Sequence, residues 1–307
     1  LFVFDGSFVR ILGAKNGAAK GLFVYKHPEK DIEVVFEAAA LANSNYFATI
    51  GTFRKMTEDK NRITPFFSFS ERIGDENDAP TTQFYTLAPE HDVTFNSIQY
   101  FTDRVVITGN FYNRDFENAM AFFSVIEMEN FKGKKPIKLS LQYLKPQDAP
   151  SFTDPKISLC GLNTYIISSS TTVLKVTEEG DVKWGKRVVQ DIHYDTRILD
   201  AHCNTFEDVA IYASQWIENK EFLHVVEVTH HGDFISHSHP VRFAFESIDV
   251  AKMETVNRKT KKQSISPSKH DLFRVDKEPV PPLIRQSYKK IQTQGNAILN
   301  PFAKIVT

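Results

Sequence analysis

The fold is decided by the stretch VLKVTEEGDVKW at residues 173–184. It contains an apolar strand core, a turn that ends in Gly-Asp, and a second strand with a tryptophan. Because Gly-Asp supplies the positive φ that a tight hairpin needs, the stretch predicts two antiparallel strands joined by a short turn. A matching stretch, VVEVTHHGDFIS at residues 225–236, predicts the same hairpin.

The apolar core of this stretch recurs along the chain. Five cores read LFVY, FFSF, FFSV, VLKV and VVEV and begin at residues 22, 66, 122, 173 and 225, so successive cores lie 44, 56, 51 and 52 residues apart. A period of this length suits one four-stranded blade of a β-propeller. A second β-rich run precedes each core and closes on a small residue, which lets a neighbouring backbone come close. These small residues are Gly13, Gly51, Gly109, Ser169 and Ala213.

We therefore expect an all-β chain, a β-propeller with about five to six four-stranded blades and an irregular C-terminal arm. The blades occupy residues 1–246. Residues 247–307 hold a closing or sixth blade, with a candidate core LFRV at 272–275, and the extended arm. The distance from the matching cysteine to the matching threonine is 17 residues in the fourth unit and 26 in the fifth, which predicts a longer hairpin loop around residues 215–222.

Two parts of the chain carry a family resemblance. Residues 105–111 with 121–125, and residues 173–184, resemble the bacterial β-propeller repeats of the SBBP type, which have an apolar strand ending in Gly, a Gly-Asp turn and a Trp-containing strand. The resemblance extends over residues 8–242. It implies a propeller that is a repeat domain of a secreted or cell-surface protein.

Composition excludes several classes of protein. The 307 residues are 41% hydrophobic and 24% charged, as is ordinary for globular proteins, and the net charge of −1 gives no general attraction to nucleic acid or to anionic membranes. No apolar run is long enough for a transmembrane helix. The 26 Phe are expected to fill the space between blades. The chain begins at Leu1 in apolar sequence without Met, which is expected of a processed chain or of part of a longer one, and the compartment stays open.

The two cysteines, Cys160 and Cys203, lie at matching positions of neighbouring units. Equivalent positions of adjacent blades are expected to be too far apart for a disulfide, so we predict two buried free thiols.

Four histidines, His230, His231, His237 and His239, lie within ten residues and could together hold a zinc ion. His230 and His231, however, occupy the positions of two glutamates in the turn of the fourth unit. We therefore expect a solvated turn, with no metal and no cofactor. The acidic runs at residues 71–78 and 207–208 are expected to be solvated loops.

The segment after residue 247 changes character. It contains the basic run NRKTKK at 257–262 and then several prolines. One interpretation is a solvated loop followed by an irregular tail. The other is an extended arm that docks on a protein partner, because proline-rich extended segments lose little entropy on docking. The candidate partner-binding residues are Arg258, Lys259, Lys261, Lys262, Pro281, Pro282 and Tyr288. Nucleic-acid binding is not expected, since the rest of the chain is neutral.

No nucleophile, dinucleotide or phosphate-loop motif is present, so we do not expect an enzyme. The predicted function is a non-catalytic structural or protein-interaction module, a rigid propeller with a docking arm in a larger assembly. The alternative is a secreted or surface propeller that binds carbohydrate or acts as a glycosidase-type enzyme at the central channel. That alternative requires carboxylates or aromatics from several blades to converge.

Overall fold

The structure is a computed structural model of the chain. It describes residues 2–5, 8–12, 19–41, 46–56, 61–71, 80–87, 93–101, 103–112, 119–132, 137–145, 152–189, 195–235, 244–265 and 267–270. The chain divides into two compact units, residues 1–270 and 271–307, and every described residue belongs to the first. In these described segments the regular structure is β-strand apart from one short helix, so the all-β prediction is confirmed.

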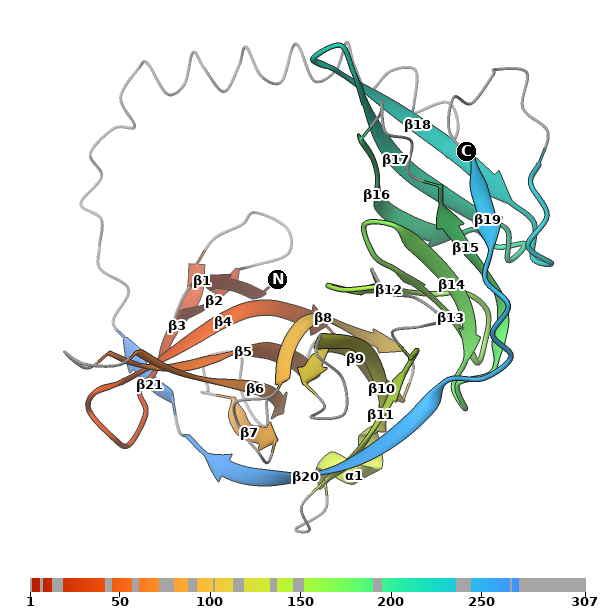
Figure 1. The fold of residues 1–307 in the computed structure, drawn as a ribbon. Coiled ribbons are helices and arrows are strands. Elements are labelled where there is room, and N and C mark those ends of the chain that lie inside the picture. The colour runs from red at the N-terminus through yellow and green to blue at the C-terminus, as the bar shows by residue number, and fades with distance from the viewer. Residues whose placement is uncertain are drawn as a thin grey trace. The chain divides into compact units, whose positions relative to one another are not determined.

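The strands follow one another as antiparallel meanders (Figure 1). The first comprises β1 (Phe2–Asp5), β2 (Phe8–Leu12) and β3 (Ala19–Tyr25). The second comprises β4 (Ile32–Leu41), β5 (Tyr46–Met56), β6 (Asn61–Glu71) and β7 (Thr81–Leu87). The third comprises β8 (Val93–Phe101), β9 (Arg104–Tyr112), β10 (Ala119–Glu127) and β11 (Lys138–Tyr143), with α1 (Met128–Lys132) before β11. The fourth comprises β12 (Lys156–Leu159), β13 (Thr164–Ser168), β14 (Thr172–Thr177) and β15 (Val182–Val188), and the fifth β16 (Asp195–Cys203), β17 (Val209–Ile217) and β18 (Lys220–Val228).

Each predicted apolar core is the third strand of its meander, and it pairs with the β-rich run that precedes it. The two predicted Gly-Asp turns also have one geometry. In both, the threonine N–H donates to the aspartate carbonyl oxygen, at 2.9 Å for Thr177 and 2.8 Å for Thr229. The φ values of Gly180 and Gly232 are 82° and 93°, in the left-handed region that glycine adopts without steric cost. The first hairpin is therefore confirmed, since β14 and β15 pair across its turn. At the second hairpin the turn is confirmed, but the described residues after it form only an isolated bridge between Phe234 and Val228 and not a strand.

Residues 244–270 run back along the edges of the other strands, and we call this segment the strap (Figure 1). Its strand β19 (Phe245–Ser247) pairs with β15. Strand β20 (Glu254–Ser264) pairs first with β11 and then with β7, and β21 (Pro267–His270) pairs with β3. The strap thus adds a strand to four meanders in reverse chain order.

The strap corrects the expectation of a loop over the basic run. Residues 257–262 lie inside β20 because the edge strands β7 and β11 offer N–H and C=O groups that need partners. Thr260, at the change from one edge to the other, is buried, and both its N–H and its hydroxyl donate to the carbonyl of Ile137, at 3.1 Å and 2.6 Å. The remainder of the predicted arm, from residue 271, lies outside the described residues, as does the candidate core at 272–275.

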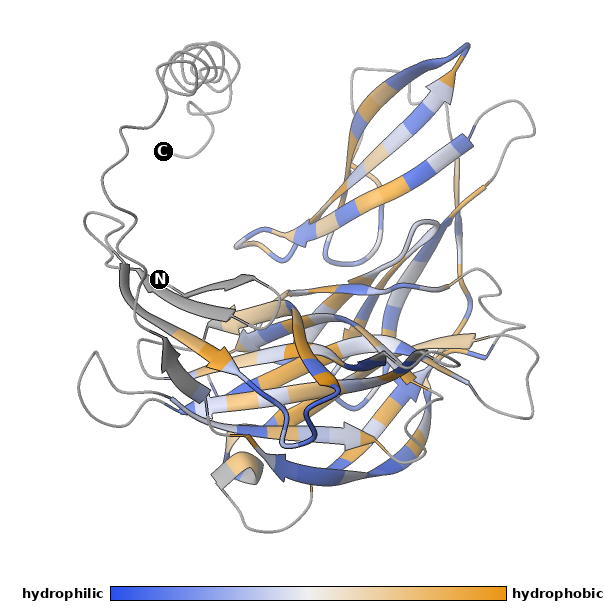
Figure 2. Cartoon of the chain, turned by 90° about the vertical axis from the view of Figure 1, so that its left-hand side faces the viewer, coloured by the Kyte–Doolittle hydropathy of each residue, from blue (hydrophilic) through white to orange (hydrophobic). Residues whose placement is uncertain are grey.

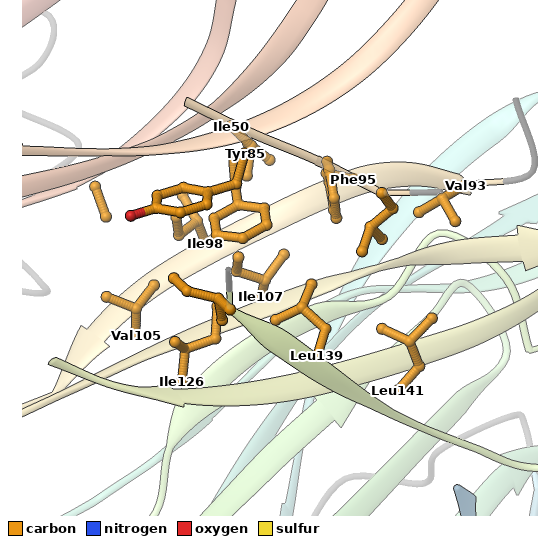
Figure 3. Close-up of a cluster of buried hydrophobic side chains, with 14 of the residues drawn as sticks. Ile50, Tyr85, Val93, Phe95, Ile98, Val105, Ile107, Ile126, Leu139 and Leu141 are labelled. Atoms are coloured by element: carbon orange, nitrogen blue, oxygen red, sulfur yellow. The ribbon is translucent and has the colours of Figure 1, made fainter. Parts of the chain in front are cut away.

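Strand β20 joins two meanders into a nine-stranded sheet with the order β4-β5-β6-β7-β20-β11-β10-β9-β8. The end strands β4 and β8 contact each other, so the sheet is nearly closed and barrel-like. Its interior holds apolar side chains from all around it, including Ile50, Tyr85, Phe95 and Leu139 (Figure 3). Figure 2 shows apolar and polar residues interspersed along the strands. Strand β8 alternates buried and exposed residues, as a strand with one solvated face does, whereas β9 is buried over most of its length.

Further apolar clusters lie between successive meanders. Tyr25 of β3 packs with Phe36, Phe66 and Phe84 of the second meander. A second cluster joins residues of β9 and β10 to β13 and β14, and a third joins β13 and β14 to β17 and β18. Phenylalanines therefore fill space on both faces of β6, since Phe66 and Phe67 belong to different clusters.

Gly51 and Gly109 lie inside β5 and β9, which continue beyond the predicted strand ends, and both glycines accommodate β-bulges of the neighbouring strand. Gly51 opposes a bulge at Glu37, and Gly109 opposes one at Asn96. A Cβ on Gly109 would lie 1.9 Å from the carbonyl oxygen of Thr94, and a Cβ on Gly51 would lie 2.1 Å from that of Val35. The predicted close approach of a neighbouring backbone is confirmed at these two glycines. Gly13 lies outside the described residues.

Two predictions about the fourth and fifth meanders are wrong. Cys160 and Cys203 form a disulfide, and their Cα atoms are 5.2 Å apart. They can do so because β12 and β16, the first strands of the two meanders, contact each other directly. Lys156 Nζ, for example, donates to the carbonyl of Leu199 on β16. The predicted longer loop at residues 215–222 is also wrong, because these residues extend the paired strands β17 and β18. The two strands are joined by a two-residue turn, Glu218 and Asn219, and both residues have positive φ.

Candidate functional site

A cleft of about 370 Å³ lies beside the strap, where the β5–β6 hairpin and the turn after β3 meet β20. We call it the basic cleft. Its lining residues are His27, Glu29, Ile32, Phe53, Lys55, Arg62, Thr64, Thr86, Lys261, Lys262 and Gln263. They come from segments that are far apart in the sequence and that the sheet pairing brings together. A volume of this size is in the range of small-molecule sites.

The lining of the basic cleft is predominantly cationic. Among the described lining residues, four side chains are basic, Lys55, Arg62, Lys261 and Lys262, and one, Glu29, is acidic. Lys55 and Arg62 are directly opposite each other in the β5–β6 pairing, so their side chains leave the same face of the hairpin. Glu29 Oε2 lies 3.6 Å from Lys55 Nζ, and neutralises part of this charge.

His27 fixes one wall of the basic cleft. Its Nδ1 accepts the backbone N–H of Glu29 at 3.1 Å, so in this geometry the ring proton is on Nε2. Nε2 lies 2.7 Å from the amide nitrogen of Gln263 on the strap, and with its proton it donates to Gln263 once the amide group is turned so that the oxygen takes the place of the nitrogen. The imidazole also packs edge-on against Phe53, with ring centroids 5.2 Å apart. His27 therefore ties the strap to the second meander.

The candidate partner-binding residues divide into three groups. Lys261 and Lys262 line the basic cleft. Arg258 and Lys259 lie on the part of β20 that pairs with β11, and they are not among the lining residues. Pro281, Pro282 and Tyr288 lie outside the described residues. The sequence did not identify Lys55 and Arg62, and only the hairpin register, which places them opposite each other, could have indicated them.

The histidine cluster is described only in part. His230 and His231 are exposed on the turn after β18, as predicted, with ring centroids 3.8 Å apart. The His230 N–H donates to Asp208 Oδ1 at 3.0 Å. His237 and His239 lie outside the described residues. Where the structure does describe side chains, it brings together no group of three His, Cys, Asp or Glu that could hold a metal ion.

A charged cluster lies between the third and fourth meanders. Arg104 forms an ion pair with Glu178 and also donates to Asn163 Oδ1 at 3.1 Å. Burial raises the pKa of Glu178, and the guanidinium of Arg104 lowers it in part. Because the two charges satisfy each other across two meanders, we interpret the cluster as structural.

The fifth meander exposes an apolar face. In the second, third and fourth meanders, one side chain of the third strand packs against the next meander along the chain. These side chains are Phe67, Phe123 and Val173, and each is fully buried. Their counterpart on β18 is Val225, which points away from the buried Val226 and is 52% exposed. Val225 pairs with Tyr212 on β17, and both are exposed. Leu223 and Trp216, which alternate with them along the same face, are exposed as well. We call these four side chains the apolar strip.

Comparisons with known protein families, with curated proteins and with solved structures find no match to this chain. Among the described residues, no helix has the length and apolar character needed to cross a membrane.

Proposed function

We propose that this chain is a non-catalytic structural and protein-interaction module, built as a β-propeller whose blades are the successive meanders. Support for the propeller comes from the order of the parts. Consecutive meanders pack through apolar clusters, and the strap closes their outer edges in reverse order. In this proposal β20 joins the edges of two neighbouring blades, and this joint produces the nine-stranded sheet.

The observation that carries the interaction role is the exposure of Val225. The corresponding third-strand residue is buried in the second, third and fourth meanders. The apolar strip therefore has the composition of an interior surface, and no described residue covers it. Contiguous exposed apolar side chains mark protein-interaction sites in soluble proteins. Tyr212 and Trp216 add the aromatic side chains that dominate interface energetics. The strip therefore fits the apolar face of a protein partner.

Gentle affinity purification followed by mass spectrometry tests the proposal. The wild-type chain is expected to retain a stoichiometric partner, and Leu223→Glu combined with Val225→Glu is expected to lose it. Lys220→Glu is the matched control, because it introduces a carboxylate on the same strand but on the alternate face. A chain that purifies alone, or a partner that survives the double substitution, contradicts the proposal.

The Cys160–Cys203 disulfide favours a second candidate, in which the same scaffold belongs to a secreted or cell-surface protein. Disulfides persist in oxidising compartments and are rare in reducing ones. Thiol titration of protein prepared from its natural source, with free thiols blocked at lysis, is expected to find none. Two titratable thiols in that preparation exclude this candidate. Carbohydrate binding is tested separately, by screening the same preparation against glycans.

A further inference from the structure

We propose that two neighbouring loops, with Leu162 of the fourth meander and Phe206 of the fifth at their tips, form a docking site for a protein surface that has an apolar pocket bordered by basic residues. We call these two side chains the loop tips. The proposal goes beyond the role of the apolar strip, whose side chains lie along the ladder of β17 and β18 and not in these loops.

The two loops are built alike. The loop between β12 and β13 consists of residues 160–164, and the loop between β16 and β17 consists of residues 204–208. In both, the N–H of the first residue donates to the carbonyl oxygen of the last, at 2.9 Å in the first loop and 2.8 Å in the second. Each loop tip is the central residue of its loop, so the two side chains occupy equivalent positions in successive meanders.

The two loops are joined to each other. Cys160, the first residue of one loop, forms a disulfide with Cys203, which immediately precedes the other. A Cβ on Gly161 would lie 2.7 Å from Oε1 of Glu207, so the loops are also in contact beyond the disulfide. The loop tips therefore belong to one surface.

Side-chain hydrogen bonds hold both loops in place. Asn204 Oδ1 accepts the backbone N–H of Phe206 at 2.8 Å, and Asn163 Oδ1 accepts a guanidinium N–H of Arg104 at 3.1 Å. Loops that are already ordered lose little conformational freedom when a partner binds. The site is therefore organised before docking.

The loop tips are apolar and almost fully in water. Leu162 is 95% exposed and Phe206 is 79% exposed, so neither contributes to a core of the chain. Scattered single apolar side chains are ordinary at protein surfaces, but these two occupy equivalent positions of joined loops. Placing both in an apolar pocket of a partner removes their surface from water and favours association.

The turns around the loop tips are acidic. Residues 160–164, 177–181, 204–208 and 229–233 together contain six carboxylates and neither lysine nor arginine. Hydrogen bonds connect these turns: the N–H of residue 178 donates to the carbonyl of residue 163 at 3.2 Å, and the N–H of residue 230 donates to the carboxylate of residue 208 at 3.0 Å. The acidic residues therefore lie at the same end of the two meanders as the loop tips.

Three of these carboxylates are neutralised within the chain, in the ion pairs Glu178–Arg104, Asp181–Lys252 and Glu207–Lys175. The other three are Glu179, Asp208 and Asp233. Glu179 and Asp233 are exposed, and neither forms an ion pair with a described residue. This charge attracts a basic protein surface and repels an anionic membrane, so we assign the loop tips to a protein partner with lysine or arginine around its apolar pocket.

Selection of phage-displayed random peptides on the immobilised full chain tests the site. We expect the enriched peptides to combine large apolar residues with lysine or arginine. Leu162→Ser and Phe206→Ser are each expected to weaken binding of a synthetic enriched peptide about tenfold, through loss of one buried apolar side chain. Val189→Ser is the matched control, since Val189 is 43% exposed and follows β15 at the opposite end of the fourth meander, and it is expected to leave the dissociation constant unchanged.

Glu179→Lys tests the charge argument. It is expected to weaken peptide binding and to reduce its dependence on salt, because one attractive charge becomes repulsive. Glu221→Lys is the matched control, since it makes the same change on the fifth meander beside the β17–β18 turn, at the opposite end from the loop tips. Melting curves verify that each variant is folded, as expected for exposed side chains.

Three results overturn the proposal: no enriched peptide, enrichment of acidic peptides, or binding that is unchanged by both Leu162→Ser and Phe206→Ser. Co-sedimentation of the wild-type chain, but not of these variants, with phosphatidylcholine vesicles in the absence of peptide enrichment assigns the loop tips to a lipid surface and also overturns it. Leu223→Glu combined with Val225→Glu alters the apolar strip and is expected to leave peptide binding unchanged. The two interaction proposals can therefore fail separately.

Discussion

Replacing Gly109 with alanine is the sharpest test of the close backbone approach at the β-bulges. The new Cβ would lie 1.9 Å from the carbonyl oxygen of Thr94 and 2.9 Å from a ring carbon of Phe122. The carbonyl belongs to β8, whose bulge at Asn96 is opposite this glycine. Relief of the overlap therefore requires the two strands to separate, because rotation of a side chain cannot remove a backbone atom.

The expected loss of stability is about 3 kcal/mol. Overpacking a well-packed site costs about 1–3 kcal/mol, and a backbone contact of this length places the substitution at the upper end. A weakened ladder hydrogen bond adds about 1 kcal/mol, and the reduced freedom of alanine in the unfolded chain returns about 1 kcal/mol. Gly51→Ala meets the carbonyl of Val35 in the same way at 2.1 Å and is expected to behave alike.

Urea unfolding followed by tryptophan fluorescence measures the effect, and Gly185→Ala is the matched control. A Cβ at Gly185 meets the Leu174 Cδ2 atom at 2.8 Å and the side chain of Ile248, and the end of Leu174 can turn aside. We expect the control to cost about 1 kcal/mol. A Gly109→Ala protein as stable as the wild type, or less affected than Gly185→Ala, would refute the bulge geometry.

Three other perturbations have definite expected outcomes. Reduction of the Cys160–Cys203 disulfide, which spans 43 residues, lowers the free energy of unfolding by about 4 kcal/mol, and urea unfolding with and without reductant checks this. Burial lowers the pKa of His224 below its usual value of 6.5. As the pH falls below 6.5, the unfolded chain therefore binds a proton at this side chain more readily than the folded chain does, and stability falls. His224→Gln should flatten the pH dependence of the melting temperature in this range. Glu207→Gln removes the carboxylate that lies 2.9 Å from Nζ of Lys175, a side chain that is only 4% exposed, and it is expected to lower stability by about 2 kcal/mol in urea unfolding. Lys175→Met is expected to cost less, because that variant leaves no buried charge without its partner.

The hairpins were predictable because their signals are local. The apolar cores, the β-rich runs before them and the Gly-Asp turns each involve residues within about one hairpin of each other, and the period in the sequence places them correctly. Gly51 and Gly109 were also recognisable, since a glycine closing a β-rich run indicates a close backbone approach. The fifth hairpin shows the limit, because an insertion of polar and apolar residues reads equally as a loop or as longer strands.

The strap was not predictable because edge pairing uses backbone groups. Residues 257–262 lack the apolar alternation of a half-buried strand, and their burial is confined to a few positions such as Thr260. The distance between Cys160 and Cys203 depends likewise on how β12 and β16 lie across two sheets. The basic cleft combines residues from four separate segments, so only Lys261 and Lys262 were recognisable, and they were recognised for another role.

The strap couples the scaffold to the basic cleft. Strand β20 supplies edge pairing to two meanders and also contributes Lys261, Lys262 and Gln263 to the cleft lining. Pairing of β20 with β7 places these side chains opposite the β5–β6 hairpin, so the cleft exists only while the strap is docked. Amide hydrogen exchange along β20 measures this docking directly: if the strap docks as one unit, the amides that pair with β7 and with β11 exchange at similar rates.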